Sequence, residues 1–293
     1  MTLARALIGV IGGSGIYDLP GLSDVRRESL ATPFGAPSDA FLSGRLGEQE
    51  LVFISRHGAG HRLGPSEVNY RANLWGLKKL GATRVISLSA VGSMREEIAP
   101  GHLVLPDQFI DRTVSRKNTF FEDGVVAHVG VANPICPQLH AHLEAAALSA
   151  GATVHRKGTY LCIEGPQFST RAESEMYRAF RADVIGMTNL PEAKLAREAE
   201  LCYATLALAT DYDTWHPGHE AVSVEAVIEV LRKNVSTARE VVRLAAMEGD
   251  RLAERTCTCS HALDHAVITA PALIPRAARE RLALLLGNRF QAP

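Results

Sequence analysis

Hydrophobic and polar positions follow a regular pattern along the chain that predicts an α/β protein. Short apolar runs of strand character alternate with segments whose apolar residues recur every three or four positions. The predicted strands are residues 7–11, 51–55, 84–88, 153–163, 184–187 and 201–210. The predicted helices are residues 65–80, 134–150, 171–180, 223–247 and 276–286, and another begins at Pro191. We therefore expect a central mixed β-sheet flanked by helices.

Polar side chains gather where the predicted strands end. The clusters are Ser14, Arg56 with His57, Ser89 with Ala90, Thr188, and Asp211 with Asp213. In open α/β sheets ligands bind beyond the carboxyl ends of the strands. This rule allows segments that are far apart in the sequence to converge on one site.

Composition narrows the class of protein. The 293 residues are 46% hydrophobic and carry a net charge of -1, which favours a folded domain with no electrostatic footprint for nucleic acid or a membrane surface. No stretch approaches the roughly 20 apolar residues that cross a bilayer. The five cysteines are too few to predict a disulfide framework. We expect one cytoplasmic domain over residues 1–293, with a helical extension from about residue 247.

A glycine-rich segment follows the first strand. Gly12, Gly13 and Gly15 surround Ser14, and the segment suits either a tight turn or an anion site. The dinucleotide fingerprint fits poorly, because Asp18 stands where its last glycine belongs. An NAD-dependent oxidoreductase is therefore a remote alternative.

Two later segments carry acid–base chemistry. Arg56 can donate two parallel hydrogen bonds to phosphate oxygens, and His57 is a titratable donor. The glycines beside them leave room for a ligand. Asp211 and Asp213 suit general acid catalysis or recognition of a ligand that donates hydrogen bonds, and also the bland role of strand-end caps.

Two groups of residues suggest a metal site only weakly. His216, His219 and Glu220 lack the spacing of a known zinc motif. The Cys257–Cys259 pair lacks a second cysteine pair nearby in the sequence, and its role stays open. We therefore expect no metal.

Six segments together resemble one family. They are IGVIGGSGIY (8–17), RHG with His61 and NYRAN (56–73), SAVGS (89–93), EGPQFSTRAE (164–173), MT with PEA (187–193) and TDYDTW (210–215). In this order they are similar to the trimeric purine nucleoside phosphorylases, and among them to those that act on 5′-methylthioadenosine. The resemblance covers roughly residues 7–235 and is less clear after residue 247.

The resemblance implies an activity and its partners. The reaction is phosphorolysis of 5′-methylthioadenosine to adenine and 5-methylthioribose 1-phosphate, in a homotrimer or a dimer of trimers. Inorganic phosphate is a co-substrate, and neither a metal nor an organic cofactor is implied. A phosphorylase of 6-oxopurine nucleosides or of methylthioinosine is the nearest alternative.

The resemblance also assigns roles to individual positions. The phosphate pocket consists of Ser14, Arg56, His57, Ser89, Ala90 and Thr188. The nucleoside is bordered by Phe168, Met187, Ser169, Asp211, Asp213, His61 and Val224, and by His128 lent from a neighbouring subunit.

Asp211 is the position that bears on specificity. A protonated carboxyl group can donate to purine N7 while its other oxygen accepts from a 6-amino group. A 6-oxopurine places an acceptor oxygen opposite that carboxyl oxygen, so the two cannot form a hydrogen bond. We expect burial and the nearby Asp213 to raise the pKa of Asp211. We also expect the loss of Arg56 to weaken phosphate binding with little effect on the fold.

Overall fold

The fold is built on an 11-stranded sheet. A computed structural model describes residues 7–13, 15–217, 224–252 and 254–290. The strands are β1 (Ile8–Gly12), β2 (Leu22–Glu28), β3 (Phe41–Leu46), β4 (Gln49–Ser55), β5 (Arg84–Ser93), β6 (Leu103–Val104), β7 (Gln108–Arg112), β8 (Val154–His155), β9 (Thr159–Ile163), β10 (Val184–Gly186) and β11 (Cys202–Asp211). The α-helices are α1 (Tyr70–Lys79), α2 (Pro137–Ser149), α3 (Arg171–Ala179), α4 (Asn189–Glu198), α5 (Val224–Met247) and α6 (Arg276–Leu286).

Strand β5 is the branch point of the sheet. One path runs β2-β3-β4-β1-β5-β10-β9-β7, and β11 joins β5 separately and continues through β6 to β8. The first half of β5 pairs in parallel with β1, up to Ser87, whereas its end pairs antiparallel with β10 at Gly92 and Ser93. Parallel and antiparallel pairs coexist, so the expected mixed sheet with flanking helices is confirmed.

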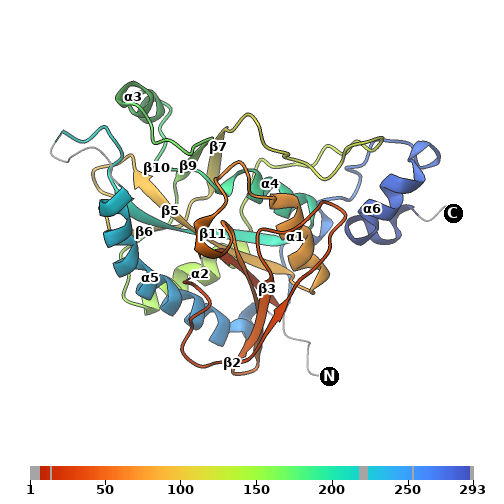
Figure 1. Cartoon of the computed structure of the whole chain (residues 1–293), viewed down its shortest axis with the longest axis horizontal. Helices are drawn as coiled ribbons and strands as arrows, with labels where there is room; N and C mark the ends of the chain where they lie inside the picture. The colour runs from red at the N-terminus through yellow and green to blue at the C-terminus, as the bar shows by residue number, and fades with distance from the viewer. Residues whose placement is uncertain (1–6, 14, 218–223, 253, 291–293) are drawn as a thin grey trace.

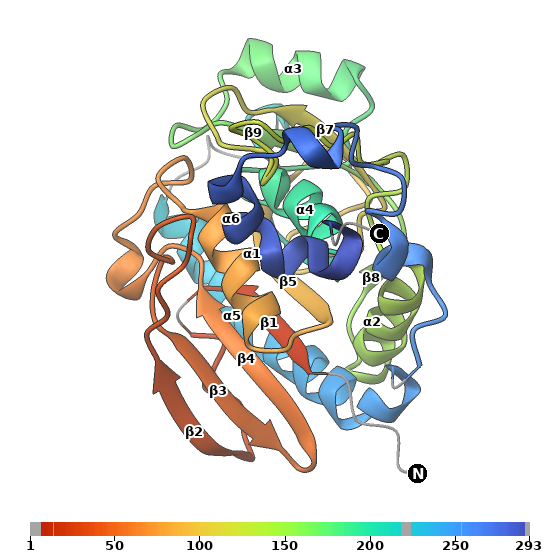
Figure 2. The ribbon, with the colours of Figure 1, turned by 90° about the vertical axis from the view of Figure 1, so that its right-hand side faces the viewer.

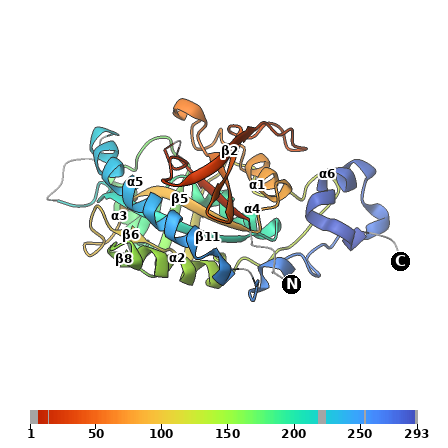
Figure 3. The ribbon, with the colours of Figure 1, turned by 90° about the horizontal axis from the view of Figure 1, so that it is seen from below.

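Helices cover both faces of the sheet. Helices α2 and α5 pack together against β11 on one face, and α1 and α4 pack together on the other (Figures 1 and 3). Helix α6 lies beside α1 at one end of the molecule, as Figure 2 shows. Within the described residues, no helix is long and apolar enough to span a membrane.

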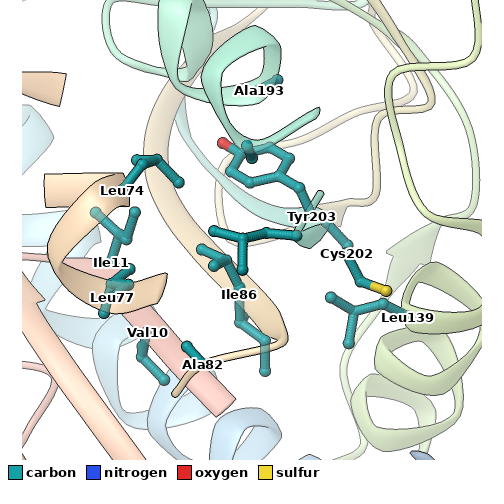
Figure 4. Packing of buried hydrophobic residues seen from close by; sticks show 14 of the residues in the cluster. Val10, Ile11, Leu74, Leu77, Ala82, Ile86, Leu139, Ala193, Cys202 and Tyr203 are labelled. Carbon is teal, nitrogen blue, oxygen red and sulfur yellow. The ribbon is translucent and has the colours of Figure 1, made fainter. Parts of the chain in front are cut away.

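The core follows from the buried central strands. All five residues of β1 are buried, and so are nine of the ten in β11, which is typical of strands covered on both faces. Figure 4 shows Ile86 of β5 between Leu77 of α1 and Tyr203 of β11. Continuous apolar runs therefore replace the alternation of a half-exposed sheet.

Several elements differ from the sequence expectations, and β6 and β7 are among the strands that were not expected. The helix expected from residue 65 begins at Tyr70, because Asn69 caps it by accepting from the Ala72 N–H. Strand β5 continues past residue 88 to Ser93, because β10 pairs with its end. Strands β2 and β3 were not expected, and β2 is almost wholly exposed, so it carries no apolar signal.

The segment after α5 packs back onto the body of the fold. It contains short 3₁₀ turns at Gly249–Leu252, Thr258–His261, Pro271–Leu273 and Gly287–Phe290, and the expected helix α6. Ala127 bridges to Val267, and the His128 N–H donates to the Ala266 carbonyl at 2.9 Å. These contacts fasten the extension to the loop that precedes α2.

Candidate active site

A cavity of about 490 Å³ lies where the pairing of β5 changes from β1 to β10. It brings together most of the residues that the resemblance assigns to a site: Arg56, His57, His61, Ser89, Ala90, Phe168, Ser169, Met187, Thr188, Asp211 and Asp213. They come from five separate segments of the chain. The cavity is the place where the polar clusters of the sequence meet.

Three expected site residues are not placed in this cavity. Ser14 lies outside the described residues, although its neighbours Gly13 and Gly15 line the cavity. Val224 is the first residue of α5, and its side chain is also outside the description. His128 is exposed and does not line the cavity of its own chain.

The backbone of β5 opens one wall of the cavity. Between Ser87, where pairing with β1 ends, and Gly92, where pairing with β10 begins, β5 is paired only with β11. Ser89 and Ala90 therefore lie inside a strand and not after its end, and Ala90 is exposed although its strand neighbours are buried. The gap in pairing, rather than a strand terminus, creates the opening.

Hydroxyl groups gather at this opening. The Ser89 Oγ lies 3.2 Å from the Thr188 Oγ1 and 3.0 Å from the Tyr160 hydroxyl. A Cβ at Gly186 would meet the Tyr160 hydroxyl at 2.0 Å, so only glycine fits there. The sequence predicts Ser89 and Thr188 as site residues, whereas Tyr160, whose hydroxyl contacts Ser89, carries no signal in the sequence.

Arg56 is held by a partner that the sequence analysis missed. Its Nε and Nη2 donate to the two oxygens of Glu192 at 2.9 and 3.0 Å, and Nη2 also donates to the Ser87 hydroxyl at 2.7 Å. Its Nη1 donates to the Leu88 carbonyl at 2.9 Å. Most N–H groups of Arg56 are therefore already paired within the protein, whereas the sequence predicted that they are free to bind phosphate.

His57 is neutral in the fold. Its Nδ1 lies 2.9 Å from the Leu63 carbonyl, which can only accept, so Nδ1 carries the proton and Nε2 is the acceptor. Burial, with the charge of Arg56 beside it, lowers the pKa of His57 to about 4. His61 stacks on its ring at 4.2 Å. The titratable donor expected from the sequence is thus a neutral ring whose N–H is already used.

A bulge aims Asp211 into the cavity. Strand β11 pairs in register with β5 up to Ala209 and Val91, and then Thr210 is skipped, so that Asp211 stands opposite Gly92. A bulge of this kind redirects the side chain that follows it. A Cβ at Gly92 would meet the Asp211 Oδ1 at 2.9 Å. The glycine therefore leaves the space that the carboxyl group occupies.

Burial dominates the electrostatics of the two carboxyl groups. It raises the pKa of Asp211. The Thr210 hydroxyl and the Asp213 N–H donate to the carboxyl group at 2.7 and 2.8 Å, and these hydrogen bonds lower the pKa by less than burial raises it. Burial also raises the pKa of Asp213, and the charge of Asp211 adds to it, while Ser174 donates to Asp213. Asp211 is therefore disposed to hold a proton.

The rest of the cavity wall is largely apolar. Ile16, Leu208, Val235 and Ala238 line it, and the last two come from α5, the helix that begins at the expected site residue Val224. From the same helix, Arg239 donates to the Gly15 carbonyl at 2.8 Å and holds the glycine loop.

One lining residue has an unused polar group. Among the described residues, the buried Ser169 Oγ has no hydrogen-bond partner. Because an unpaired buried hydroxyl is costly, it is available to a ligand.

The residues once considered as metal ligands separate into two groups. The His216 Nε2 lies 3.1 Å from a Glu96 oxygen, outside the cavity lining, and His219 and Glu220 are outside the described residues. Cys257 and Cys259, in contrast, lie beside Cys136 and Cys202 in a cluster away from the cavity. In the described part of the chain, this is the group with the geometry of a metal site.

Comparisons with known proteins agree with this arrangement. The model of the phosphorylase superfamily matches residues 7–246. The S-methyl-5′-thioadenosine phosphorylase of Geobacter sulfurreducens is 61% identical over 96% of this chain and 98% of its own. A methylthioadenosine phosphorylase from an antarctic soil metagenomic library superposes with a TM-score of 0.92 at 48% identity, over 96% of this chain and 99% of that chain. The methylthioadenosine phosphorylase of Schistosoma mansoni in complex with adenine gives 0.78 at 39% identity, over 83% and 91%.

Proposed function

This chain belongs to the phosphorylase superfamily and, within it, to the S-methyl-5′-thioadenosine phosphorylases, and from that membership we propose how its cavity works. The enzyme, a pentosyltransferase, cleaves the N-glycosidic bond of S-methyl-5′-thioadenosine with inorganic phosphate. The products are adenine and 5-methylthioribose 1-phosphate.

Phosphate binds at the hydroxyl end of the cavity. Ser89 and Thr188 donate to it, the backbone of Gly13, Gly15 and Ala90 approaches it, and Arg56 supplies positive charge and its remaining Nη1 proton. The family resemblance assigns the Ser14 hydroxyl to the same pocket. His57 offers an acceptor nitrogen, which suits a protonated phosphate oxygen. Holding phosphate against the anomeric carbon lowers the barrier by up to about 7–11 kcal/mol, and its charge stabilises the cationic sugar.

Asp211 is the general acid for the leaving base. Its position opposite Gly92, partly buried and with a raised pKa, is the observation that carries the proposal. The protonated carboxyl group donates to N7 and accepts from the 6-amino group of adenine. The Thr210 hydroxyl also lies 3.2 Å from the Val91 carbonyl, so it can turn there when Asp211 is protonated.

The remaining lining residues position the nucleoside. Phe168 and Met187 border the base and ribose, Ser169 donates to a ligand atom, and Asp213 supports the purine side. His61 borders the 5′ substituent beside the apolar Val235 and Ala238, which suit a methylthio group. The family resemblance assigns Val224 to the same part of the substrate.

The assembly and its location extend the proposal. The chain forms a homotrimer, singly or as a dimer of trimers, in which the exposed His128 completes a neighbour's cavity. It acts in the cytoplasm, in keeping with its five free cysteines. Phosphate is the only co-substrate, and no metal or organic cofactor takes part in the chemistry.

One assay tests the function. The dialysed enzyme is incubated with S-methyl-5′-thioadenosine, adenosine or inosine, each with and without phosphate, and free base is measured by chromatography. We expect adenine from S-methyl-5′-thioadenosine only when phosphate is present. Base release without phosphate indicates a hydrolase, and preferred release of hypoxanthine indicates a 6-oxopurine enzyme.

A further inference from the structure

Four of the five cysteines come together in one cluster. Cys136 caps α2, Cys202 is the first residue of β11, and Cys257 and Cys259 belong to the C-terminal extension. Their sulfur atoms all lie within 4.8 Å of one another, and the Sγ atoms of Cys202 and Cys257 are 3.3 Å apart. These residues are up to 123 positions apart in the sequence, so the fold and not local spacing creates the cluster.

The dimensions are those of a four-cysteine metal site. A zinc ion with four thiolate ligands at about 2.3 Å holds them about 3.8 Å apart in a tetrahedron. Sulfur atoms that already lie 3.3 to 4.8 Å apart reach this geometry with shifts of less than about 1 Å. We propose that Cys136, Cys202, Cys257 and Cys259 bind one zinc ion, which fastens the C-terminal extension to α2 and β11.

The charges around the cluster fit thiolate ligands. Four thiolates around a dication leave two net negative charges, and three arginines adjoin the sulfur atoms. The Arg197 Nη1 lies 3.6 Å from the Cys259 Sγ. Arg255 interacts electrostatically with Cys202, and Arg84 does so with Cys136, Cys202 and Cys257. The site can therefore hold its excess negative charge without a further cation.

Arg84 gives independent support. Its residue is only 1% exposed, and its Nη1 and Nη2 donate to neutral acceptors, the Thr83 hydroxyl at 3.0 Å and the Glu254 carbonyl at 3.3 Å. Its Nε has no hydrogen-bond partner, and among the described residues no carboxylate lies within ion-pairing distance. A buried charge that faces no opposite charge is destabilising. Thiolates at the start of the neighbouring strand supply the negative charge that this guanidinium group lacks.

Zinc binding is linked to protons. Thiols bind zinc as thiolates, so zinc uptake by this cluster is accompanied by proton release to solvent.

A path from solvent reaches the cluster. Cys257 is half-buried, and Cys259 contributes to the wall of a second cavity, of about 590 Å³, together with Thr258, Arg197 and His140. An ion can thus enter the folded chain. This zinc is structural and lies outside the active site, so it does not conflict with chemistry that needs no metal, but it does depart from the sequence expectation of no metal anywhere.

The test measures zinc in the full-length protein. Protein from zinc-supplemented cells, purified without chelator, is analysed by elemental mass spectrometry, and zinc released by a mercurial reagent is counted. We expect one zinc ion per chain in the parent and at least a tenfold loss in Cys257→Ser and Cys259→Ser. Cys162→Ser is the matched control, because Cys162 is a buried cysteine of β9 outside the cluster, and it retains the metal.

A second measurement tests the metal site in the parent protein, without any substitution. Apo parent protein is titrated with cobalt(II), and we expect the visible bands of a tetrahedral thiolate complex, saturating at one ion per chain. Absence of zinc from the parent together with absence of these bands overturns the proposal. So does zinc that persists in both serine variants, or a thiol count showing that the cluster forms disulfides in the protein as purified.

Discussion

The guanidinium group of Arg56 and the carboxylate of Glu192 meet in a two-point contact beneath the active site, with oxygen distances of 2.9 and 3.0 Å. Both residues are almost fully buried, at 2% and 0% exposure. Of the five guanidinium N–H groups, four donate within the protein, so one on Nη1 is left for phosphate. The residue is therefore part of the core as well as of the site.

The first prediction concerns this pair. Arg56→Ala should raise the KM for phosphate and also lower the free energy of unfolding by about 3–5 kcal/mol, because it leaves Glu192 charged and buried alone. The sequence alone predicts that loss of Arg56 has little effect on the fold, and the buried contact with Glu192 contradicts that prediction. Phosphate saturation curves and denaturant unfolding measure the two effects.

A second substitution provides the control. Glu192→Gln keeps an oxygen for the Ser87 and Tyr203 hydroxyls, which donate at 2.6 and 2.9 Å, but removes the charge. Arg56→Ala combined with Glu192→Gln should therefore be more stable than Arg56→Ala alone. Equal stability of Arg56→Ala and the parent would refute the structural role.

The second prediction concerns Asp211. Burial raises the pKa of Asp211, and the proposed role requires its protonated form, so kcat/KM for S-methyl-5′-thioadenosine should fall as pH rises through that pKa. Asp211→Asn should lower kcat/KM by about 100-fold, within the usual range for losing a general acid, and remove this alkaline limb. It should also improve the relative use of inosine. Unchanged kinetics on both nucleosides would exclude the role.

The third prediction concerns the space beside that carboxyl group. Gly92→Ala places a methyl group about 2.9 Å from the Asp211 Oδ1 and 3.0 Å from Ile185, so the carboxyl group must move. Misplacement by about 1 Å costs on the order of 100-fold in rate. Gly130→Ala is the matched control, since a Cβ there meets nothing within 4 Å. Full activity of Gly92→Ala would show that the carboxyl group tolerates displacement.

The fourth prediction concerns acid stability. His57 stays neutral in the folded chain down to a pKa of about 4, whereas the unfolded chain binds a proton near pH 6.5. The unfolded state thus holds more protons between these values, and the free energy of unfolding is lost as pH falls through this window. The loss is at most about 3 kcal/mol.

Comparison with a variant isolates this contribution. His57→Asn should flatten the pH dependence between pH 6.5 and 4, because the titrating ring is gone. Denaturant unfolding at fixed chain concentration gives the two profiles. Parallel profiles would mean that other groups account for the loss of stability in this pH window.

Elements with strong local signals could be predicted from the sequence. The helix at Arg276–Leu286 was expected over the same residues, and α3 and β11 were expected to within one residue at either end. Each has either apolar periodicity or a continuous buried run. Strand β2 has neither, because it lies at the edge of the sheet and its side chains face solvent.

The residues of the site divide in the same way. Sequence motifs predicted Asp211, Ser89 and Thr188 as site residues. The residues that hold site side chains in place are distant in the sequence, so no local spacing indicates them. Glu192 lies 136 positions from Arg56, and Ser174 lies 39 from Asp213. The cysteine cluster is the extreme case, since only the folded chain shows that Cys136 and Cys202 complete the C-x-C pair.

Strand β11 begins at Cys202 and ends at Asp211, about 30 Å away at 3.3 Å per residue. Its first residue belongs to the cysteine cluster, and its last lines the cavity at the position where we propose that the purine binds. Substitutions that far apart add without coupling. Heat resistance and the choice of purine can therefore be tuned separately, in evolution or by engineering, at opposite ends of one strand.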